Sequence, residues 1–252
     1  MIIIGARAHT VKEIDEVGGL GYPFAEISLN DPDEVEAQMP ELLRMKEWYR
    51  IDYMAHYPNE GNPFDVDGLK KIFVPKMKRL LDLSEDLGIR KGTIHFWMDR
   101  RWASAELVQD KIALLKDMVD HAAGKGIVLC IENLSERFES FSPAFDAIKE
   151  LRMTLDFGHG QLLSKINTSI GFMENVFDRI AHVHVHDNFG GTSVKDDLHL
   201  GLGQGSIDYP GLLPILCSKG YDSTITMEVK PADMPETGRL LSRYLKLVLR
   251  DG

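Results

Sequence analysis

Acidic and imidazole side chains recur near the ends of several short apolar runs in this sequence of 252 residues. Glu132 lies near the end of IVLCIEN, Asp156 lies in MTLDFG, Glu228 lies in TITMEV, and histidines alternate with valines in AHVHVHD. If each run is a β-strand, alternate residues share a face, so these side chains lie opposite the large apolar ones. Carboxylates and imidazoles are rarely buried unless they are paired or bound to a metal. Two carboxylates in one site could also move a proton to and from a substrate carbon.

Three other runs add residues of the same kind at matching positions, namely Glu26, His56 and His95. Taken singly, a strand histidine is more often a hydrogen-bonded core residue than a ligand, and an inward glutamate is often an ion-pair partner. Taken together, the carboxylates would leave uncompensated buried charge unless cations neutralise them. The set therefore predicts a divalent metal site.

Such a site needs a scaffold that brings the ends of several strands together. The sequence has eight β-type runs, at 2–6, 24–29, 51–57, 92–97, 127–133, 153–158, 180–187 and 224–229. Amphipathic stretches separate them, and Ser104 can cap a helix whose apolar residues follow the i, i+3, i+4 spacing up to Gly124. Pro75 lies inside the stretch 67–87 and predicts either a kink or a separate preceding turn.

Eight strand and helix units without an intervening linker predict an α/β fold, a single (β/α)₈ TIM barrel domain spanning residues 1–252. The alternative is an open doubly wound sheet, but its usual G-x-G-x-x-G turn after the first strand is missing. In a barrel, one set of alternating side chains points inward, and active sites lie at the carboxyl ends of the strands. We therefore expect the carboxylates and histidines to converge at that mouth.

The composition excludes several classes of protein. Acidic residues outnumber basic ones 39 to 29, and the net charge of −10 excludes a simple polycation. No run approaches the roughly 20 apolar residues of a membrane span, and the opening MIIIGAR lacks the basic leader of a signal peptide. Cys130 and Cys217 are too few for a disulfide framework or a cysteine zinc site. We expect an intracellular, cytoplasmic protein with no membrane partner.

The order of these motifs resembles the xylose-isomerase-like TIM barrels, a superfamily of sugar and sugar-phosphate isomerases and epimerases that also includes apurinic endonucleases of the endonuclease IV type. The resemblance covers essentially the whole chain and is carried by IEN, LDFGH, HVHVHDN, DLHLGLGQGSID and MEV. It implies the four-ligand metal set of the isomerases and epimerases: Glu132, Asp156, His184 and Glu228. Because His182 and His186 share a face with His184, the choice of His184 rests on the resemblance alone.

The endonuclease branch of the superfamily uses additional ligands for a three-zinc cluster. In this sequence, five residues occupy corresponding places: His56, His95, His159, Asp197 and His199. In isomerase-like members the same histidines line the sugar pocket, so the ligands alone do not choose the branch. The loops argue against DNA, because NDPDEVEAQMPE after the second run and Glu60 and Asp65 after the third would repel phosphates at the mouth. We therefore expect no nucleic-acid partner.

These observations lead us to expect a metal-dependent isomerase or epimerase of a small sugar, sugar phosphate or related polyol ketone. Manganese, magnesium, cobalt or zinc would stabilise an enediolate while Glu132 and Glu228 transfer the proton. The alternative is a zinc-dependent apurinic endonuclease or other phosphodiesterase, and a third hypothesis is a non-catalytic metal- or sugar-binding barrel. Further contacts to the small-molecule substrate are expected from Glu26, His186, Arg100, Arg101 and Lys230. The resemblance also implies that a homodimer can form.

Overall fold

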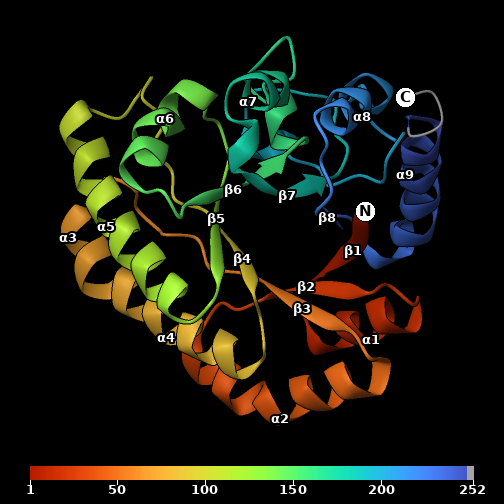
Figure 1. Ribbon diagram of the computed structural model, residues 1–252, viewed down its shortest axis with the longest axis horizontal. Coiled ribbons are helices and arrows are strands. Elements are labelled where there is room, and N and C mark those ends of the chain that lie inside the picture. Colours follow the sequence, from red (N-terminus) through yellow and green to blue (C-terminus); the bar gives the residue numbers. More distant parts are fainter. Residues whose placement is uncertain (249–252) are drawn as a thin grey trace.

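Eight parallel strands close into a barrel, in which each strand pairs with its neighbour in sequence order and β8 pairs with β1 (Figure 1). The computed structural model describes residues 1–248. The strands are β1 (Ile3–Ala8), β2 (Phe24–Ser28), β3 (Asp52–His56), β4 (Lys91–Ile94), β5 (Val128–Glu132), β6 (Arg152–Asp156), β7 (Ile180–Val185) and β8 (Thr224–Met227). The fold is the predicted (β/α)₈ TIM barrel and not an open sheet.

Helices surround the barrel and cover the outer face of its strands (Figure 1). They are α1 (Val11–Gly19), α2 (Pro32–Tyr49), α3 (Val66–Gly68), α4 (Val74–Asp86), α5 (Ala105–Gly124), α6 (Phe138–Ala147), α7 (Ser169–Asn175), α8 (Tyr209–Ser218) and α9 (Met234–Val248). The helix predicted after Ser104 is α5, and its buried face includes Val108, Ile112 and Leu115, as the apolar spacing indicates. The longer helices therefore present an apolar stripe to the barrel wall, whereas α3 buries no residue.

Ser104 caps α5, because its hydroxyl accepts a hydrogen bond from the Leu107 N–H at 3.1 Å. We expect Ser104→Ala to lower the free energy of unfolding by about 1 kcal/mol, since it leaves one N–H of the first turn without a partner. Urea unfolding followed by circular dichroism checks the value. Ser218→Ala is the control, because the Ser218 hydroxyl donates to a carbonyl at the end of α8. Equal stability of the two variants would contradict this account of the cap.

The stretch that contains Pro75 is helical throughout but has one irregular turn. A π-turn over Leu69–Phe73 joins α3 to α4, and Pro75 lies in the first turn of α4. The proline therefore stands where the regular helical hydrogen-bond pattern starts again, rather than inside it. The irregularity predicted before Pro75 is present as this π-helical segment, which continues directly into α4.

Strand boundaries differ from the predicted ones at two places that matter for the site. β1 extends to Ala8 instead of ending at residue 6, so the side chain of Arg7 belongs to the barrel and is buried. β4 ends at Ile94, so His95 directly follows the strand instead of lying within it. Both residues consequently lie at the mouth of the barrel, where the strands end.

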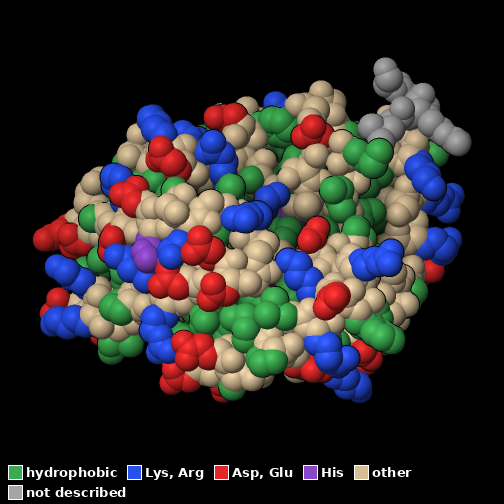
Figure 2. All heavy atoms as spheres, turned by 60° about the horizontal axis from the view of Figure 1, so that its bottom comes forward, with side chains coloured by type: hydrophobic (Ala, Val, Ile, Leu, Met, Phe, Trp, Pro, Cys, Tyr) green, Lys and Arg blue, Asp and Glu red, His purple; other side chains and the backbone are tan. Residues whose placement is uncertain are grey.

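The surface carries charges of both signs. Figure 2 shows Lys and Arg side chains interspersed with Asp and Glu over the face that it presents, with hydrophobic groups between them. On this face the basic groups do not form the continuous stripe that follows a nucleic-acid backbone. Within residues 1–248, no helix is both long enough and apolar enough to cross a lipid bilayer.

Candidate metal centre and active site

Four buried side chains from neighbouring strands meet at the mouth of the barrel. We call them the central group, and they are Glu132, Asp156, His184 and Glu228. One potential ligand atom from each lies within 4.8 Å of those of the others. His184 Nδ1 is 3.0 Å from Glu132 Oε1, 3.5 Å from Glu228 Oε1 and 3.7 Å from Asp156 Oδ2. The closed barrel achieves this because β5 to β8 are consecutive and bring their carboxyl ends together.

The donor set of the central group fits a divalent cation. Three carboxylates with one imidazole suit manganese, magnesium or cobalt, and zinc also accepts these ligands. Asp156 Oδ2 is buried and is one of four buried side-chain atoms in the described residues that have no hydrogen-bond partner. A buried oxygen without a partner is costly, so an ion at this place would remove a real penalty.

Glu26 lies beneath the central group and orients its histidine. Its carboxylate is fully buried and contacts His184 Nε2 at 2.9 Å, which leaves Nδ1 facing the three carboxylates. The neighbouring His182 contacts Glu26 at 3.0 Å and Thr224 at 2.7 Å, so its ring lies deeper in the barrel. Burial lowers the pKa of His182 to about 4, which leaves it neutral. Glu26 therefore lies below the site and orients His184, in the manner in which carboxylates commonly orient metal-binding histidines, and its expected contact with a substrate stays a prediction.

The carboxylates around His184 favour the charged form of its imidazole ring. Burial opposes the charged form of His184, but Glu228, Glu26 and Glu132 outweigh burial and raise its pKa well above 6.5. Burial would raise the pKa of Glu228, whereas the positive charge of His184 contributes to lowering it to about 2. A histidine ligand must be deprotonated, so a bound cation would replace this positive charge.

A second set of side chains, the His56 group, adjoins the central group and shares Glu132 with it; it comprises His56, His95 and Glu132. His95 Nε2 is 2.8 Å from Glu132 Oε2, and His56 Nε2 is 3.5 Å from the same oxygen. The other ring nitrogen of His95 contacts Asn59 Oδ1 at 2.7 Å, which fixes the ring orientation. The histidines that the resemblance associates with either zinc or sugar therefore contact the central group directly.

A third set of side chains, the His199 group, lies on the other side of the central group; it comprises His159, His186, Asp197 and His199. Asp197 Oδ2 is 3.2 Å from the Nε2 atoms of both His159 and His199. The ring of His186 stacks on that of His199 at 4.1 Å between centroids. Asp197 Oδ1 and both ring nitrogens of His186 are buried without hydrogen-bond partners within the described chain. His186 Nε2 nevertheless lies 3.2 Å from Asp156 Oδ1, so the atoms without hydrogen bonds adjoin the central group and fit an additional ligand beside it.

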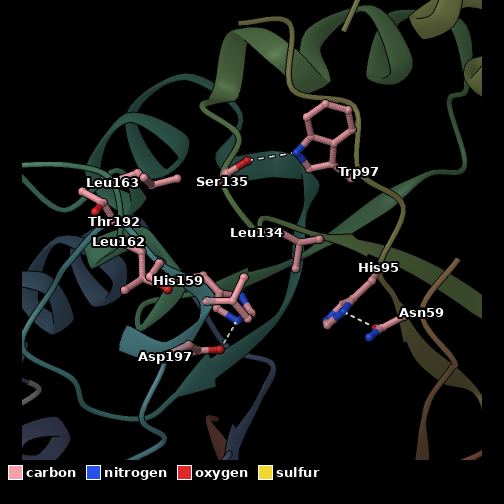
Figure 3. Close-up of a pocket in the computed structure, with 12 residues that line it drawn as sticks. Asn59, His95, Trp97, Leu134, Ser135, His159, Leu162, Leu163, Thr192 and Asp197 are labelled. Atoms are coloured by element: carbon pink, nitrogen blue, oxygen red, sulfur yellow. Dashed lines mark hydrogen bonds and ion pairs between the residues drawn. The ribbon is translucent and has the colours of Figure 1, made fainter. Parts of the chain in front are cut away.

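A cavity of about 450 Å³ opens next to these groups (Figure 3). Its lining residues are Asn59, His95, Trp97, Leu134, Ser135, His159, Leu162, Leu163, Thr192, Ser193, Val194 and Asp197. His95 and Asp197 therefore belong both to the candidate ligand groups and to the cavity wall. Trp97 is held in the wall by a hydrogen bond from its indole N–H to the Ser135 hydroxyl at 3.1 Å (Figure 3). The cavity thus has apolar side chains in its walls. His95 and His159 line the part of the cavity that is nearest to Glu132 and Asp197.

None of the five residues expected to contact substrate lines this cavity: Glu26, His186, Arg100, Arg101 and Lys230. Glu26 and His186 belong to the buried groups described above. Arg101 pairs with the buried carboxylate of Asp99 at 2.6 Å, which occupies its guanidinium group. Arg100 and Arg101 line a separate cavity of about 350 Å³ together with Arg137, Glu139 and Ser140. Lys230 is exposed. Their roles toward a substrate stay predictions.

Sequence reasoning misses Arg7, whose side chain is buried at the mouth. Arg7 pairs in register with Glu26 of β2, and its Nε is 3.2 Å from Glu228 Oε1. The alternation that identifies the inward glutamates could also have identified Arg7, because residues two apart in a strand share a face and Arg7 follows Gly5 by two positions. The predicted first strand stops at residue 6 and therefore excludes it.

We expect the metal-free protein to lose stability as the pH rises from about 6.5 through about 9. Burial opposes a charged His199, but its hydrogen bond to Asp197 and nearby carboxylates raise its pKa to about 9. The pKa of His184 is also raised. A raised histidine pKa stabilises the folded state fully below the unfolded value near 6.5, and this contribution disappears above the folded pKa. Thermal melts of chelator-treated protein between pH 6 and 10 measure the effect, and a Tm that stays constant or rises would contradict it.

Comparison with known families identifies a match along most of the chain. Residues 14–245 match the model of a family described as xylose isomerase-like TIM barrel. The uncharacterized protein MJ1311 of Methanocaldococcus jannaschii is 25% identical over 223 residues, covering 82% of this chain and 74% of that protein. The uncharacterized protein MJ1614 of the same organism is 34% identical over 179 residues, covering 66% of each.

Solved structures share the whole architecture. A D-tagatose 3-epimerase-like protein superimposes with a TM-score of 0.85 at 23% identity, covering 99% of both chains. An L-ribulose 3-epimerase gives a TM-score of 0.78 at 14% identity, covering 100% of this chain and 96% of the other. The IolI protein with a bound zinc atom gives 0.71 at 16% identity, covering 99% and 97%. At these identities the likeness establishes a common fold.

Proposed function

Because the chain belongs to the xylose isomerase-like TIM barrel family, we propose that it is a metal-dependent isomerase or epimerase of a small sugar, sugar phosphate or related polyol ketone. The observation that carries this proposal is the approach of two buried carboxylates, Glu132 and Glu228, to one nitrogen of His184, at 3.0 and 3.5 Å. A barrel that only binds sugar needs hydrogen bonds to hydroxyls but has little use for two bases on one metal. The likeness to a D-tagatose 3-epimerase-like protein and to an L-ribulose 3-epimerase supports the same choice.

Glu132 and Glu228 would supply the proton transfer. Glu132 ends β5 and Glu228 follows β8, so the two carboxylates reach a shared substrate from different strands. One carboxylate removes the proton from the carbon beside the carbonyl. The other returns a proton to the opposite face of that carbon, which gives epimerisation, or to the neighbouring atom, which gives isomerisation.

The central group would hold the metal ion. When bound, the ion supplies positive charge beside the carbonyl and adjacent hydroxyl oxygens, where negative charge develops as the proton leaves. Glu26 keeps the His184 ring in place, and Asp156 contributes the carboxylate oxygen that otherwise lacks a partner. His95 and His159 line the cavity and contact Glu132 and Asp197, which positions them to hold substrate oxygens.

The cavity is consistent with a small substrate. Its volume of about 450 Å³ lies in the range of small-molecule sites. Trp97, Leu134 and Leu162 form apolar walls, which limit the access of water to the carbon that loses its proton.

Proton transfer to carbon can be detected by isotope incorporation. We would incubate the metal-loaded protein in D₂O with ketoses, ketose phosphates and polyol ketones and follow the products by NMR. At least one compound should be interconverted with its isomer or epimer and carry deuterium beside the carbonyl, because the returning carboxylate exchanges its proton with solvent. Turnover without deuterium would contradict the two-carboxylate mechanism, and no exchange in any compound would contradict the proposed function.

The flanking groups favour one second candidate function, a zinc-dependent phosphodiesterase of the endonuclease IV type. The His56 and His199 groups add several imidazoles and the Asp197 carboxylate beside the central group. Imidazole and carboxylate side chains are typical zinc ligands. Three zinc ions per chain by elemental analysis, with nicking of an abasic duplex, would favour this candidate. One or two ions and no nicking would favour the isomerase or epimerase.

A further inference from the structure

We propose that Arg7 is a positioning residue that fixes the Glu228 carboxylate for metal binding and proton transfer. The inference rests on the proposed function to the extent that Glu228 serves as ligand and base. It adds a residue of β1, a strand that contributes nothing to the three candidate ligand groups.

The Arg7 guanidinium group bridges three strands at the mouth. Its Nε is 3.2 Å from Glu228 Oε1, its Nη1 donates to the Glu26 carbonyl at 3.0 Å, and its Nη2 donates to the Ser28 hydroxyl at 2.9 Å. β1 lies between β2 and β8 in the barrel, so it is the strand from which one side chain can reach both neighbours. The side chain of Arg7 is only 7% exposed. Its planar fork is therefore anchored on β2 and holds a positive charge beside the Glu228 carboxylate.

Arg7 makes the two glutamates unequal. Within the described residues, every ion-pair partner of Glu132 is a histidine. His95 lies at 2.8 Å and His184 at 3.0 Å. Glu228 in addition has a guanidinium partner, which stays charged under all ordinary conditions. Oε1 of Glu228 forms the ion pair with Arg7 at 3.2 Å, and Oε2 lies 3.7 Å from His199 Nδ1. Charged or polar partners therefore flank both oxygens, and Arg7 is the partner whose own position is anchored on a neighbouring strand.

Positioning and simple charge compensation predict opposite results. If Arg7 only adds positive charge, its removal should strengthen cation binding, because a repulsive charge leaves the site. If Arg7 positions Glu228, its removal should weaken cation binding, because the carboxylate must then be ordered by the incoming ion. Removing the partner of a ligating side chain commonly weakens metal affinity by about 10 to 100-fold.

The test compares Arg7→Met and Arg7→Lys with the wild-type protein. Each protein is stripped with a chelator and titrated calorimetrically with Mn²⁺ and, separately, with Zn²⁺. We expect Arg7→Met to bind the ion at least about 10-fold more weakly. Arg7→Lys should be intermediate, because an ammonium group can reach Glu228 but cannot keep both the Glu26 carbonyl and the Ser28 hydroxyl as acceptors. With substrate, kcat should fall in the same order while KM changes little.

Arg179→Met is the matched control for loss of a largely buried arginine. Arg179 precedes β7 and donates to the carbonyls of Lys149 and Phe145 at 2.8 and 3.0 Å, away from the ligand groups. The Arg179→Met variant should be less stable than the wild-type protein but bind the metal ion with wild-type affinity. If Arg7→Met does not fold, Arg7→Lys and Ser28→Ala carry the test, and both must bind the ion more weakly than wild type.

Three outcomes separate this inference from the proposed function. Metal affinity in Arg7→Met that equals or exceeds the wild-type value would overturn the positioning role and leave the proposed function standing. Metal binding that depends on Arg7, without turnover of any ketose, would overturn the proposed function alone. A wild-type protein that binds neither Mn²⁺ nor Zn²⁺ would overturn both.

Discussion

Glu132→Gln and Glu228→Gln are each expected to lower kcat by about 10³-fold or more, which corresponds to at least about 4 kcal/mol of transition-state stabilisation. Glutamine keeps the size of the side chain but removes the base and one negative charge. The two carboxylates lie within 3.5 Å of the same His184 nitrogen, so either loss also weakens the site for a cation. Steady-state kinetics on a confirmed substrate, at saturating metal, measure the effect.

Glu136→Gln is the control for these two variants. Glu136 is also buried, but its carboxylate accepts main-chain N–H groups of Met98, Leu134 and Ser135. The change should lower thermal stability while kcat stays within a few-fold of wild type. Wild-type kcat in either Glu132→Gln or Glu228→Gln would refute the assigned mechanism.

Lys111→Met is expected to lower the free energy of unfolding by about 3–5 kcal/mol, because it leaves a buried carboxylate without its counter-ion. Lys111 Nζ is 2.5 Å from Glu60 Oε2, and the two side chains are 0% and 6% exposed. The other oxygen of Glu60 accepts the main-chain N–H of Trp97 at 2.7 Å. The pair therefore anchors the loop that carries one wall of the cavity. Urea unfolding monitored by circular dichroism gives the free energy, and Trp97 contributes to the fluorescence change.

The double variant Glu60→Gln with Lys111→Met separates the lost pair from the lost packing. It removes both charges and keeps an acceptor for the Trp97 N–H, so most of the lost stability should return. A single Lys111→Met variant that unfolds like the wild type would show that the buried pair contributes little. Equal loss in the single and double variants would assign the effect to the contact of the Lys111 ammonium group with the Phe96 ring, whose centre is 4.3 Å from Nζ.

The order of the strands and the inward direction of the glutamates follow from local patterns in the sequence. Alternation in IVLCIEN and TITMEV places Glu132 and Glu228 on the inner face, and eight such runs in sequence order close into a barrel. The cap at Ser104 is equally local, since its hydroxyl and the N–H it binds are three residues apart. Such features depend on neighbours along the chain and are therefore visible without the structure.

Features that depend on contacts between distant segments could not be obtained in this way. Alternation puts His182, His184 and His186 on one face. Their depth in the barrel decides that His182 contacts Thr224 below the site, whereas His184 lies among the three carboxylates. The placement of Arg101 depends on the approach of its loop to the segment after β5, where the Arg101 guanidinium donates to the Ser135 carbonyl. The burial of Arg7 depends on where β1 stops, and strand ends are set by pairing with β2 and β8 rather than by residue type.

Glu132 has one oxygen directed to each of two ligand groups. Oε1 lies 3.0 Å from His184 of the central group, and Oε2 lies 2.8 Å from His95 of the His56 group. Ions bound in both groups would share this carboxylate, so their affinities would be thermodynamically linked. Each ion would change the affinity of the other by the same factor. The first ion would order the carboxylate for the second but also repel it, and the balance would decide whether loading is stepwise or concerted. The number of ions carried by the protein would then vary with the free metal concentration to which it was last exposed.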